Sequence, residues 1–505
     1  MVDRLPTIAI GVTTMSENTS ATNAPGAGIR RGQQYLEGLR DERDVWLRGE
    51  KVVDVTSHPG LGRGAHTLAG FMDRQFDPSL QERITYEENG TRYAMAFLKP
   101  KSQADVVRRG DAFYEWATWS NGMFGRTPDY KNASLTAFAA SADFLAQGKP
   151  EFAANMGNYY EYVRANDKVL THTLVNPTFS HAQAKEGKYD DKVALHVVKE
   201  TDAGIVVRGA RLLATLGPHA DEIEVFPSSL LTASEENLPF AFAFAMPLAT
   251  PGLRMICRDS YDHGKSHFDA PLASRYEEMD AVVTFDDVLV PWERVFMYRD
   301  PMLCNRAFAE TNAVVHMMHQ VVCGKLAKAE FIVGLLCAMA KATGKDKDMA
   351  IKGQIAEAMM MTESIRALRF SAEAQAEVDQ YGHYLPLRRP LDTSRNLFPK
   401  MYPRLVELVQ LLGSSSLMAT PCEADLTNAI SGDVAQYFQT ANLESRERIG
   451  LYRLAHDVAV SGFGNRQVLY ERFFFGPQNI MASIYYDLYD KDAVIARVES
   501  LLAET

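Results

Sequence analysis

Two polar side chains in the first third of the chain have a spacing that can bring them into one binding site. Arg126 and Tyr130 lie four residues apart in the segment Gly122–Asn132, which reads GMFGRTPDYKN. If the chain becomes helical beyond Pro128, both side chains point into one cavity. A guanidinium and a phenol there suit a ligand that is planar, anionic or both. The alternative interpretation is a helix-breaking turn with an Arg–Asp pair at the surface.

His172 lies between two threonines at the point where a helical pattern gives way to a strand pattern. Histidine exchanges a proton near neutral pH, so it suits acid–base chemistry. The hydroxyls of Thr171 and Thr173 are candidates to orient the imidazole or to bond to a ring system. The alternative is a structural histidine at a domain junction.

Two later segments contain residues that suit a cofactor. Thr215 ends a predicted strand, where its hydroxyl can face a bound molecule. In the run Ser461–Pro477 (SGFGNRQVLYERFFFGP), Gly464 and Asn465 allow the backbone to approach a phosphate or a ring closely. Arg466 is a candidate partner for a pyrophosphate.

Several other chemistries have no motif in this chain. It contains no GxSxG, no HExxH, no GxxxxGK[ST] and no strand followed by GxGxxG. His316 and His319 lie three residues apart on a predicted helix, but no carboxylate nearby in the sequence completes a metal-binding set. We interpret them as a histidine pair in a helix-bundle core and predict no metal site.

The composition is that of a globular protein with a large core. The chain has 505 residues, 46% apolar and 23% charged, and a net charge of −11. Acidic and basic residues are interspersed without a basic stripe, which argues against a nucleic-acid partner. No apolar run reaches membrane-spanning length. The five cysteines form no CxxC pair, which is typical of a reducing compartment, so we expect a cytoplasmic protein.

The chain divides by pattern into an α+β arrangement. We predict a disordered leader over residues 1–29, a helical domain over 30–168, a β domain over 169–298 and a helical bundle domain over 299–505. Short β-branched runs separated by turn residues predict an antiparallel barrel or sandwich in the third part. In the last part, Ala307–Ala342 is predicted as one long helix, followed by further long helices that suggest a bundle.

Five motifs in order along the chain resemble the oxygenase component of the 4-hydroxyphenylacetate 3-monooxygenase family, which includes related two-component phenol hydroxylases. The motifs are GRTPDY at 125–130, LTHTLVNP at 170–177, KETDAGIVVRGARLLATLGPHADEI at 199–223, LVPWERVFMYRD at 289–300 and FGNRQVLYERFFFG at 463–476. The resemblance covers about residues 30 to 495.

The resemblance implies an acyl-CoA-dehydrogenase-like fold, with an N-terminal helical domain, a central β domain and a C-terminal four-helix bundle, in a homotetramer. It also implies FAD that arrives reduced, as FADH2, from a separate NAD(P)H-dependent flavin reductase. With O2 as co-substrate the flavin forms a C4a-hydroperoxide, which hydroxylates a phenol ortho to its hydroxyl.

The family's substrate and catalytic residues correspond to Arg126, Tyr130 and His172, where a positive charge and a proton acceptor favour the phenolate. Its flavin contacts correspond to positions in four separate segments: His172, Thr173, Leu174, Thr178, Ser180, Thr215, Gly464, Asn465, Arg466 and Gln467. The stretch Thr178–His181 departs from the acidic–basic pair of many relatives. Tyr130, which chlorophenol hydroxylases often lack, favours the 4-hydroxyphenylacetate type.

The para substituent of the phenol remains open. Ser228 and Ser229, in a polar stretch after Phe226, are candidates to close over the ring. The substrate is a free phenol of the 4-hydroxyphenylacetate type or, alternatively, a chlorophenol, a nitrophenol or a carrier-tethered tyrosyl group.

Two other classes are also considered. One is a 4-hydroxybutyryl-CoA dehydratase with an iron–sulfur cluster, for which His316 and Cys323 supply half a ligand set but residues 95–140 contain no cysteine. The other is a non-catalytic flavin-binding protein, which the grouping of an arginine, a phenol and a histidine argues against.

Overall fold

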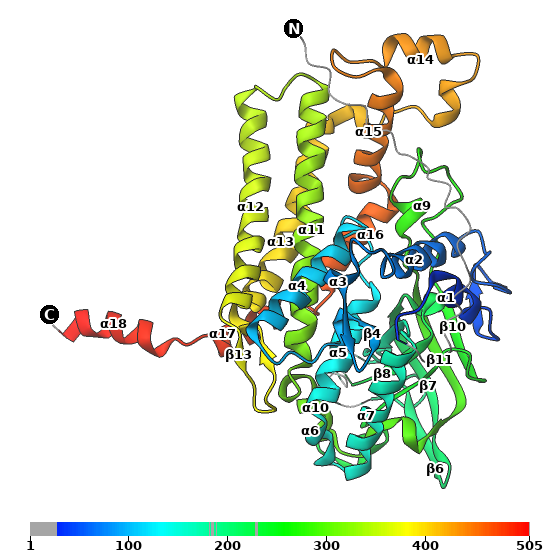
Figure 1. Ribbon diagram of the computed structural model, residues 1–505, viewed down its shortest axis with the longest axis vertical. Coiled ribbons are helices and arrows are strands. Elements are labelled where there is room, and N and C mark those ends of the chain that lie inside the picture. Colours follow the sequence, from blue (N-terminus) through cyan, green and yellow to red (C-terminus); the bar gives the residue numbers. More distant parts are fainter. Residues whose placement is uncertain (1–27, 181, 183–185, 188, 228–230, 504–505) are drawn as a thin grey trace.

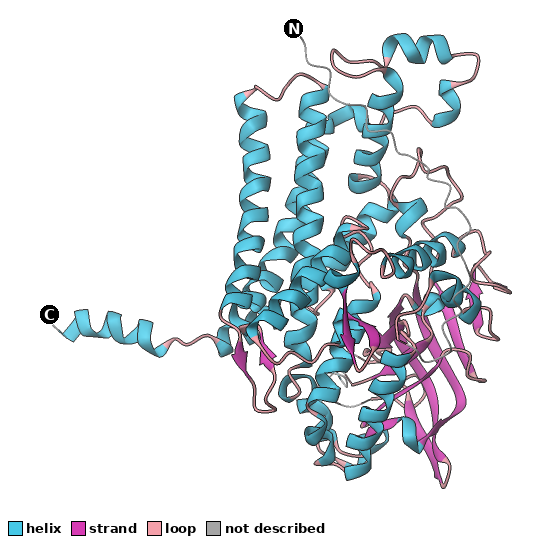
Figure 2. Cartoon of the chain, in the orientation of Figure 1, coloured by secondary structure: helices cyan, strands magenta, loops and turns pink. Residues whose placement is uncertain are grey.

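The computed structural model describes residues 28–180, 182, 186–187, 189–227 and 231–503 (Figure 1). The leader predicted for residues 1–29 therefore lies outside the described residues, apart from its last two. The elements follow the predicted order, with helices first, two sheets next and long helices last (Figure 2).

The first part of the chain is mainly helical. Ser102 caps the helix Gln103–Thr118 by accepting a hydrogen bond from the Asp105 amide. Pro128 begins another helix, at a position where its missing N–H costs nothing. The helices are α1 (Gly32–Gly38), α2 (Gly62–Arg74), α3 (Gln81–Ile84), α4 (Gln103–Thr118), α5 (Pro128–Ala140), α6 (Ala142–Ala146) and α7 (Pro150–Ala165), with a hairpin of β3 (Thr85–Glu88) and β4 (Thr91–Ala94).

Two sheets form the middle of the molecule. The larger has the order β2-β1-β10-β11-β7-β6 and comprises β1 (Asp44–Leu47), β2 (Glu50–Lys51), β6 (His196–Thr201), β7 (Gly204–Thr215), β10 (Leu253–Cys257) and β11 (Asp280–Pro291). The smaller has the order β12-β9-β8-β5 and comprises β5 (Leu170–Thr173), β8 (Glu222–Val225), β9 (Phe242–Pro247) and β12 (Val295–Tyr298).

The strand pairs are mostly antiparallel, as predicted, with two exceptions. β5 pairs with β8 in parallel, and β1 pairs with β10 in parallel. Because β1 and β2 precede residue 168, one sheet takes strands from both sides of the expected domain boundary. The short α9 (Ala273–Tyr276) lies between β10 and β11.

The last part is a bundle of long helices, seen at the upper left of Figure 1. It comprises α11 (Ala313–Ala342), α12 (Met349–Ala374), α13 (Arg388–Gly413) and α15 (Ser445–Ala459), and α16 (Gly462–Phe473) packs beside α13 and α15. α11 is apolar on most of its circumference, so it packs against α12 and α13 on one side and against α4 and α5 on the other. It therefore joins the bundle to the segment that carries Arg126.

The single helix predicted over Ala307–Ala342 was wrong. The structure has α10 (Pro301–Glu310) and then α11, because Asn312 adopts a left-handed conformation with φ of 57° and interrupts the helix. The remaining elements are the hairpin β13 (Glu377–Val378) and β14 (Tyr384–Leu385), and the helices α14 (Ser431–Tyr437), α17 (Gln478–Leu488) and α18 (Asp492–Ala503).

All five cysteines are free. In the part of the chain that the structure describes, no helix combines the length and the hydropathy needed to cross a membrane.

Candidate active site

Arg126 and Tyr130 face one site at the start of α5, as their spacing predicts. The chain turns through residues 121–127 and becomes helical at Pro128. The Arg126 guanidinium carbon lies 4.4 Å from the centroid of the Tyr130 ring and 4.5 Å from that of Phe474, which follows α16. The guanidinium therefore lies against two aromatic faces, a favourable position for a cation.

Two donors of the Arg126 guanidinium lack an acceptor with hydrogen-bond geometry in the part of the chain that the structure describes. Nε and Nη1 are both buried, and neither has an acceptor among the described residues. A buried N–H without an acceptor is uncommon and costs free energy, so such a group suggests a missing ligand. Here the missing ligand has to place an acceptor atom beside the charged guanidinium of Arg126 and the phenol ring of Tyr130.

The surroundings of Arg126 keep it charged. Although burial disfavours the cation, Tyr130, Tyr470 and Glu278 raise the pKa of Arg126 above its usual value. The site therefore presents a permanent positive charge to a bound molecule.

His172 completes the group. It lies on β5, and its ring centroid is 5.8 Å from that of Tyr130, with 37° between the ring planes. Burial lowers the pKa of His172 well below its usual value, and the positive charges of Lys131 and Arg126 lower it further. At neutral pH the unliganded imidazole is therefore neutral and available as an acceptor, and its own titration lies at lower pH than that of an ordinary histidine.

The hydroxyls beside His172 bind the other sheet instead of orienting the imidazole. Thr171 Oγ1 donates to the carbonyl of Thr215 and Thr173 Oγ1 donates to the carbonyl of Leu212, each at 2.6 Å. Both threonines thus attach β5 to β7. Because side chains alternate along a strand, His172 points the other way, toward α5.

A buried ion pair that the sequence did not reveal lies next to His172. Lys131 follows Tyr130 on α5, and its Nζ lies 2.6 Å from Glu224 Oε2; both side chains are at most 3% exposed. Glu224 is the register partner of His172 in the parallel pair β5–β8. The only sequence signal was a glutamate in a strand, which normally indicates an exposed position.

The predicted flavin contacts near the C-terminus have other partners in this structure. Gly464–Gln467 is not a turn but the first part of α16, capped by Ser461. Arg466 donates to Asp280 and Glu278 at 2.6 to 3.0 Å, so in this structure its guanidinium is paired with carboxylates, and its pairing with a pyrophosphate stays a prediction.

The neighbouring residues are engaged in the same way. Gln467 donates to the carbonyl of Met123 and accepts from Lys328, while exposed Asn465 donates to the carbonyls of Val460 and Ser461. Gly464 is needed for packing, since a Cβ there would lie 2.1 Å from the carbonyl oxygen of Val458.

The other predicted flavin contacts lie around the end of β5. Thr215 is buried and donates to Asp280 Oδ1 at 2.7 Å, Leu174 and Ser180 are half-buried, and Thr178 is exposed. Ser228, Ser229 and His181 lie outside the described residues.

This part of the surface fits a planar, partly apolar group with N–H donors. Asn176 Oδ1 is buried and has no hydrogen-bond partner among the described residues. Next to it, Val175 forms a bridge with Leu212, and the side chains of Val175, Leu213 and Phe179 are 45%, 63% and 67% exposed. An isoalloxazine ring combines an apolar face with an N–H edge, so the residues present fit FAD.

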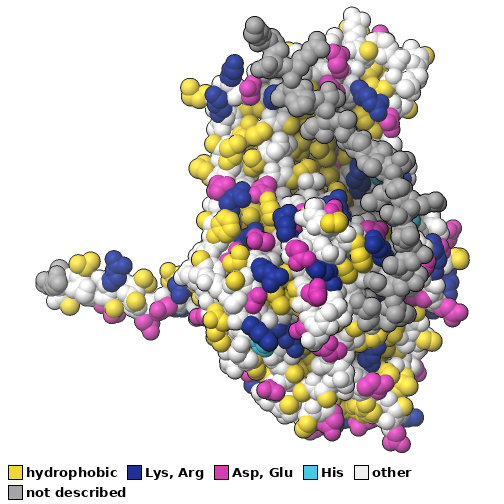
Figure 3. Space-filling view, in the orientation of Figure 1, with side chains coloured by type: hydrophobic (Ala, Val, Ile, Leu, Met, Phe, Trp, Pro, Cys, Tyr) yellow, Lys and Arg dark blue, Asp and Glu magenta, His cyan; other side chains and the backbone are white. Residues whose placement is uncertain are grey.

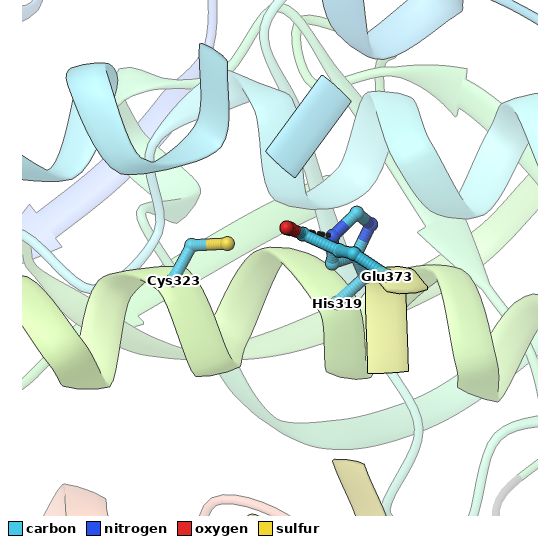
Figure 4. A group of neighbouring side chains, drawn as sticks. All are labelled: His319, Cys323 and Glu373. Carbon is cyan, nitrogen blue, oxygen red and sulfur yellow. Dashed lines mark hydrogen bonds and ion pairs between the residues drawn. The ribbon is translucent and has the colours of Figure 1, made fainter. Parts of the chain in front are cut away.

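One group of possible metal ligands occurs among the described residues (Figure 4). His319 and Cys323 on α11 lie near Glu373 on α12, and the three ligand atoms are within 4.8 Å of one another. Glu373 Oε1 already accepts from His319 Nε2 at 2.9 Å and from Arg369 Nε at 2.8 Å. Because Arg369 neutralises the carboxylate, the group has the character of an internal ion pair.

The carboxylate that the sequence analysis did not find near His319 is therefore supplied by another helix. His316 and His319 are both buried, in line with their interpretation as a core pair.

The comparisons with known proteins agree across the chain. A family model described as 4-hydroxyphenylacetate 3-hydroxylase N terminal matches residues 31–297, and one described as 4-hydroxyphenylacetate 3-hydroxylase C terminal matches residues 304–503. The chain is 45% identical over 477 residues to the 4-hydroxyphenylacetate 3-monooxygenase oxygenase component of Thermus thermophilus, which covers 94% of this chain and 98% of the relative.

Solved structures show the same fold. A crystal structure of the oxygenase component of 4-hydroxyphenylacetate 3-monooxygenase, complexed with FAD and 4-hydroxyphenylacetate, superposes with a TM-score of 0.90 at 45% identity, over 94% of this chain and 98% of that one. An archaeal 4-hydroxybutyryl-CoA dehydratase from N. maritimus superposes with a TM-score of 0.85 at 17% identity, over 94% and 95%, which shows a shared fold alone. The expected acyl-CoA-dehydrogenase-like fold is thereby confirmed.

Proposed function

The chain belongs to the 4-hydroxyphenylacetate 3-hydroxylase family, and on this premise we propose that it is the oxygenase component of a two-component flavin monooxygenase that hydroxylates a para-substituted phenol, 4-hydroxyphenylacetate or a close relative, ortho to its hydroxyl. The observation that carries the proposal is the pair of buried, unpartnered donors on Arg126 beside Tyr130 and His172. A phenol oxygen supplies the acceptor that these donors lack.

Arg126 stabilises negative charge on that oxygen. The ring of a phenol is attacked more readily as the oxygen approaches the phenolate, so a fixed positive charge there lowers the barrier. Because Arg126 is charged and its donors are already oriented in a dry environment, little reorganisation is needed when the charge develops.

His172 and Tyr130 act on the proton and the position of the phenol. The neutral imidazole accepts a hydrogen bond from the phenol hydroxyl and then its proton. Tyr130 offers a hydroxyl donor and an aromatic edge, and its ring also supports Arg126. The three side chains thus bind the phenol, orient it and hold its proton.

We assign the flavin site to the end of β5 and the surface next to it. Reduced FAD, when bound, supplies with O2 the oxygen atom that enters the ring. His172, Thr173 and Leu174 form one border, Asn176 offers an acceptor, and exposed apolar side chains cover the ring. Thr215, Thr178 and Ser180 remain proposed contacts, whereas Arg466 acts through its carboxylate partners.

The partners follow from the same premise. A separate NAD(P)H-dependent flavin reductase supplies the reduced FAD, because the name of the relative specifies an oxygenase component. We propose a homotetramer, as in the family that the chain resembles. Contact with other copies is supported by the C-terminal helix α18, which projects from the body and carries exposed Val494, Ile495, Val498, Leu501 and Leu502 (Figure 3). We place the protein in the cytoplasm, where the free thiols stay reduced.

Product analysis tests the function. The purified protein is mixed with chemically reduced FAD, oxygen and a panel of para-substituted phenols, and catechols and hydrogen peroxide are measured. We expect a catechol from 4-hydroxyphenylacetate. If a chlorophenol, a nitrophenol or a carrier-tethered tyrosyl group is the better substrate, the proposed reaction stands and only the assignment of the para substituent changes. Failure of the protein to alter flavin oxidation and to form any catechol would refute the monooxygenase.

A further inference from the structure

The loop that carries Arg126 is held at its backbone by a carboxylate from the β region. Glu278, 1% exposed, precedes β11. Its Oε1 accepts a hydrogen bond from the Gly125 amide at 3.0 Å, and its Oε2 accepts one from the Arg126 amide at 2.8 Å. Two charge-assisted hydrogen bonds to adjacent amides fix the backbone at Arg126, and with it the origin of the side chain.

Arg466 on α16 holds this carboxylate in turn. Its Nη1 donates to Glu278 Oε1 at 2.6 Å, while its Nε and Nη2 donate to the two oxygens of Asp280 at 3.0 and 2.7 Å. The planar fork of a guanidinium suits this double pairing. Asp280 also accepts a hydrogen bond from the Thr215 hydroxyl, so the support of the loop that carries Arg126 extends to the end of β7.

Two further side chains of α16 contact the same loop. Gln467 Nε2 donates to the carbonyl of Met123 at 2.9 Å, and the Tyr470 hydroxyl donates to the carbonyl of Gly125 at 3.3 Å. The packing is tight, since a Cβ on Gly125 would lie 2.7 Å from the Tyr470 ring. The loop is therefore held between α16 and Glu278.

We propose that Glu278 is a positioning residue for the hydroxylation: it acts through the Gly125 and Arg126 amides to place the Arg126 guanidinium at the phenol oxygen, and Arg466 keeps it in place. The inference rests on the proposed function, because that function makes Arg126 the phenol-binding charge. A displacement of about 1 Å in such a group costs up to about a hundredfold in rate.

The test compares two neighbouring glutamates. Glu278→Gln keeps the size of the side chain but replaces one acceptor oxygen by an NH2 group, which cannot accept from an amide. We expect the KM for 4-hydroxyphenylacetate to rise about tenfold or more and the catechol formed per reduced FAD to fall. The dissociation constant of reduced FAD, measured anaerobically without phenol, stays within about twofold of wild type, because Glu278 acts on Arg126.

Glu277→Gln is the matched control. Glu277 is 2% exposed and pairs with Arg258 Nη1 at 2.7 Å, so its neutralisation also removes a buried ion pair. We expect it to leave the KM for the phenol at the wild-type value, because the Gly125 and Arg126 amides donate to Glu278 and not to Glu277. Equal changes of KM in both variants would overturn a specific role of Glu278.

Amide hydrogen exchange provides a readout that needs no substrate. Exchange at Gly125 and Arg126 should accelerate in Glu278→Gln and not in Glu277→Gln. Wild-type exchange at these amides, or a wild-type KM in spite of faster exchange, would overturn the inference. If the wild-type protein forms no catechol from any phenol, the proposed function fails, and the exchange comparison still decides whether Glu278 holds the loop.

A second variant tests the same inference if Glu278→Gln does not fold. Arg466→Lys keeps the positive charge but loses the fork that binds both carboxylates. We expect a smaller change in the same direction, with faster exchange at the two amides and a higher KM for the phenol. Unchanged values of both would count against the inference.

Discussion

Two buried groups of positive charge lie close together along α16, and they differ in how completely they are paired. Lys325 and Lys328 on α11 both bind Glu471, with Lys328 Nζ at 2.6 Å, and Lys328 also donates to Gln467. Three residues further along the chain, Phe474 packs on Arg126, whose Nε and Nη1 have no acceptor among the described residues. We call the group of Lys325, Lys328 and Glu471 the closed cluster, because its charges are paired with one another. We call the surroundings of Arg126 the open site, because donors there are left for a ligand.

The difference separates stability from binding. Although burial opposes its charge, Lys325 and Lys328 lower the pKa of Glu471 to about 2, so the closed cluster is a set of charges that satisfy one another. In the open site the unpaired donors of Arg126 raise the free energy of the unliganded protein. A ligand with a negatively charged oxygen accepts their hydrogen bonds and removes this unfavourable contribution. Variants of the two groups should therefore have opposite effects.

Replacing the open-site cation should have the largest effect on chemistry. We expect Arg126→Met to reduce catechol formation about a hundredfold or more, because the charge at the phenol oxygen is lost. Flavin oxidation with release of hydrogen peroxide should continue, and the melting temperature should not fall, since two unpaired donors are removed. Parallel assays of catechol and peroxide, with a thermal melt, provide the check; full catechol formation would remove Arg126 from the site.

Opening the closed cluster should affect stability instead. Glu471→Gln leaves two buried lysines without a carboxylate, and we expect the free energy of unfolding to fall by about 3–5 kcal/mol. Denaturant unfolding at pH 7 measures this loss, and catechol formation by the folded fraction should stay within about threefold of wild type.

The pH dependence of that loss follows from the lowered pKa. The contribution of Glu471 is fully present above pH 4.5, its ordinary pKa, and is lost as the pH falls toward about 2. The difference between wild type and variant should therefore shrink across this window. A difference that is constant with pH would show that Glu471 stabilises through packing.

Removing a single hydroxyl from the open site should have a smaller effect. Tyr130→Phe keeps the ring against Arg126 and His172 and removes one donor, so we expect the rate of hydroxylation to fall about tenfold. Tyr35→Phe is the control, because its buried hydroxyl donates to the carbonyl of His219 at 2.7 Å, away from the site. Single-turnover product yields compare the two, and equal losses would deny Tyr130 a direct role.

The smallest expected effect is a shift of the pH profile. Because the pKa of His172 lies well below 6.5, the imidazole stays neutral from pH 8 to 6.5. Titration of His172 should therefore not change the rate of hydroxylation across that range. The double variant Lys131→Met, Glu224→Gln removes the buried ion pair and leaves neither an unpaired lysine nor an unpaired glutamate. Loss of the Lys131 charge raises the pKa of His172, so the acid limb of the profile should move to higher pH. An unmoved limb would mean that His172 does not accept the phenol proton.

The sequence indicated the open site through local spacing. Arg126 and Tyr130 are joined by a helix start at Pro128, and His172 lies where strand residues begin, so short-range rules were sufficient to nominate all three. The order of helical and β segments also follows from local pattern. The break at Asn312 was missed, because a left-handed residue in an otherwise apolar helical pattern leaves little signal.

The residues whose contacts the sequence did not reveal have partners far away in the chain. Lys131 binds Glu224, and the hydroxyls of Thr171 and Thr173 bind carbonyls of β7. Pairings between segments so far apart depend on how strands and helices pack, which residue spacing does not encode.

The sequence by itself determined the class of fold and the family, and it nominated the three side chains of the proposed phenol site. Only the tertiary structure decided which buried cations are available to a ligand. Arg126 and Arg466 both lie near glycines and aromatic residues, yet Arg466 is neutralised by Glu278, 188 residues away, while two donors of Arg126 have no partner among the described residues. The reason is physical: a charge is satisfied by whatever folding brings within 3 Å of it, and that depends on the packing of α16 against the start of β11.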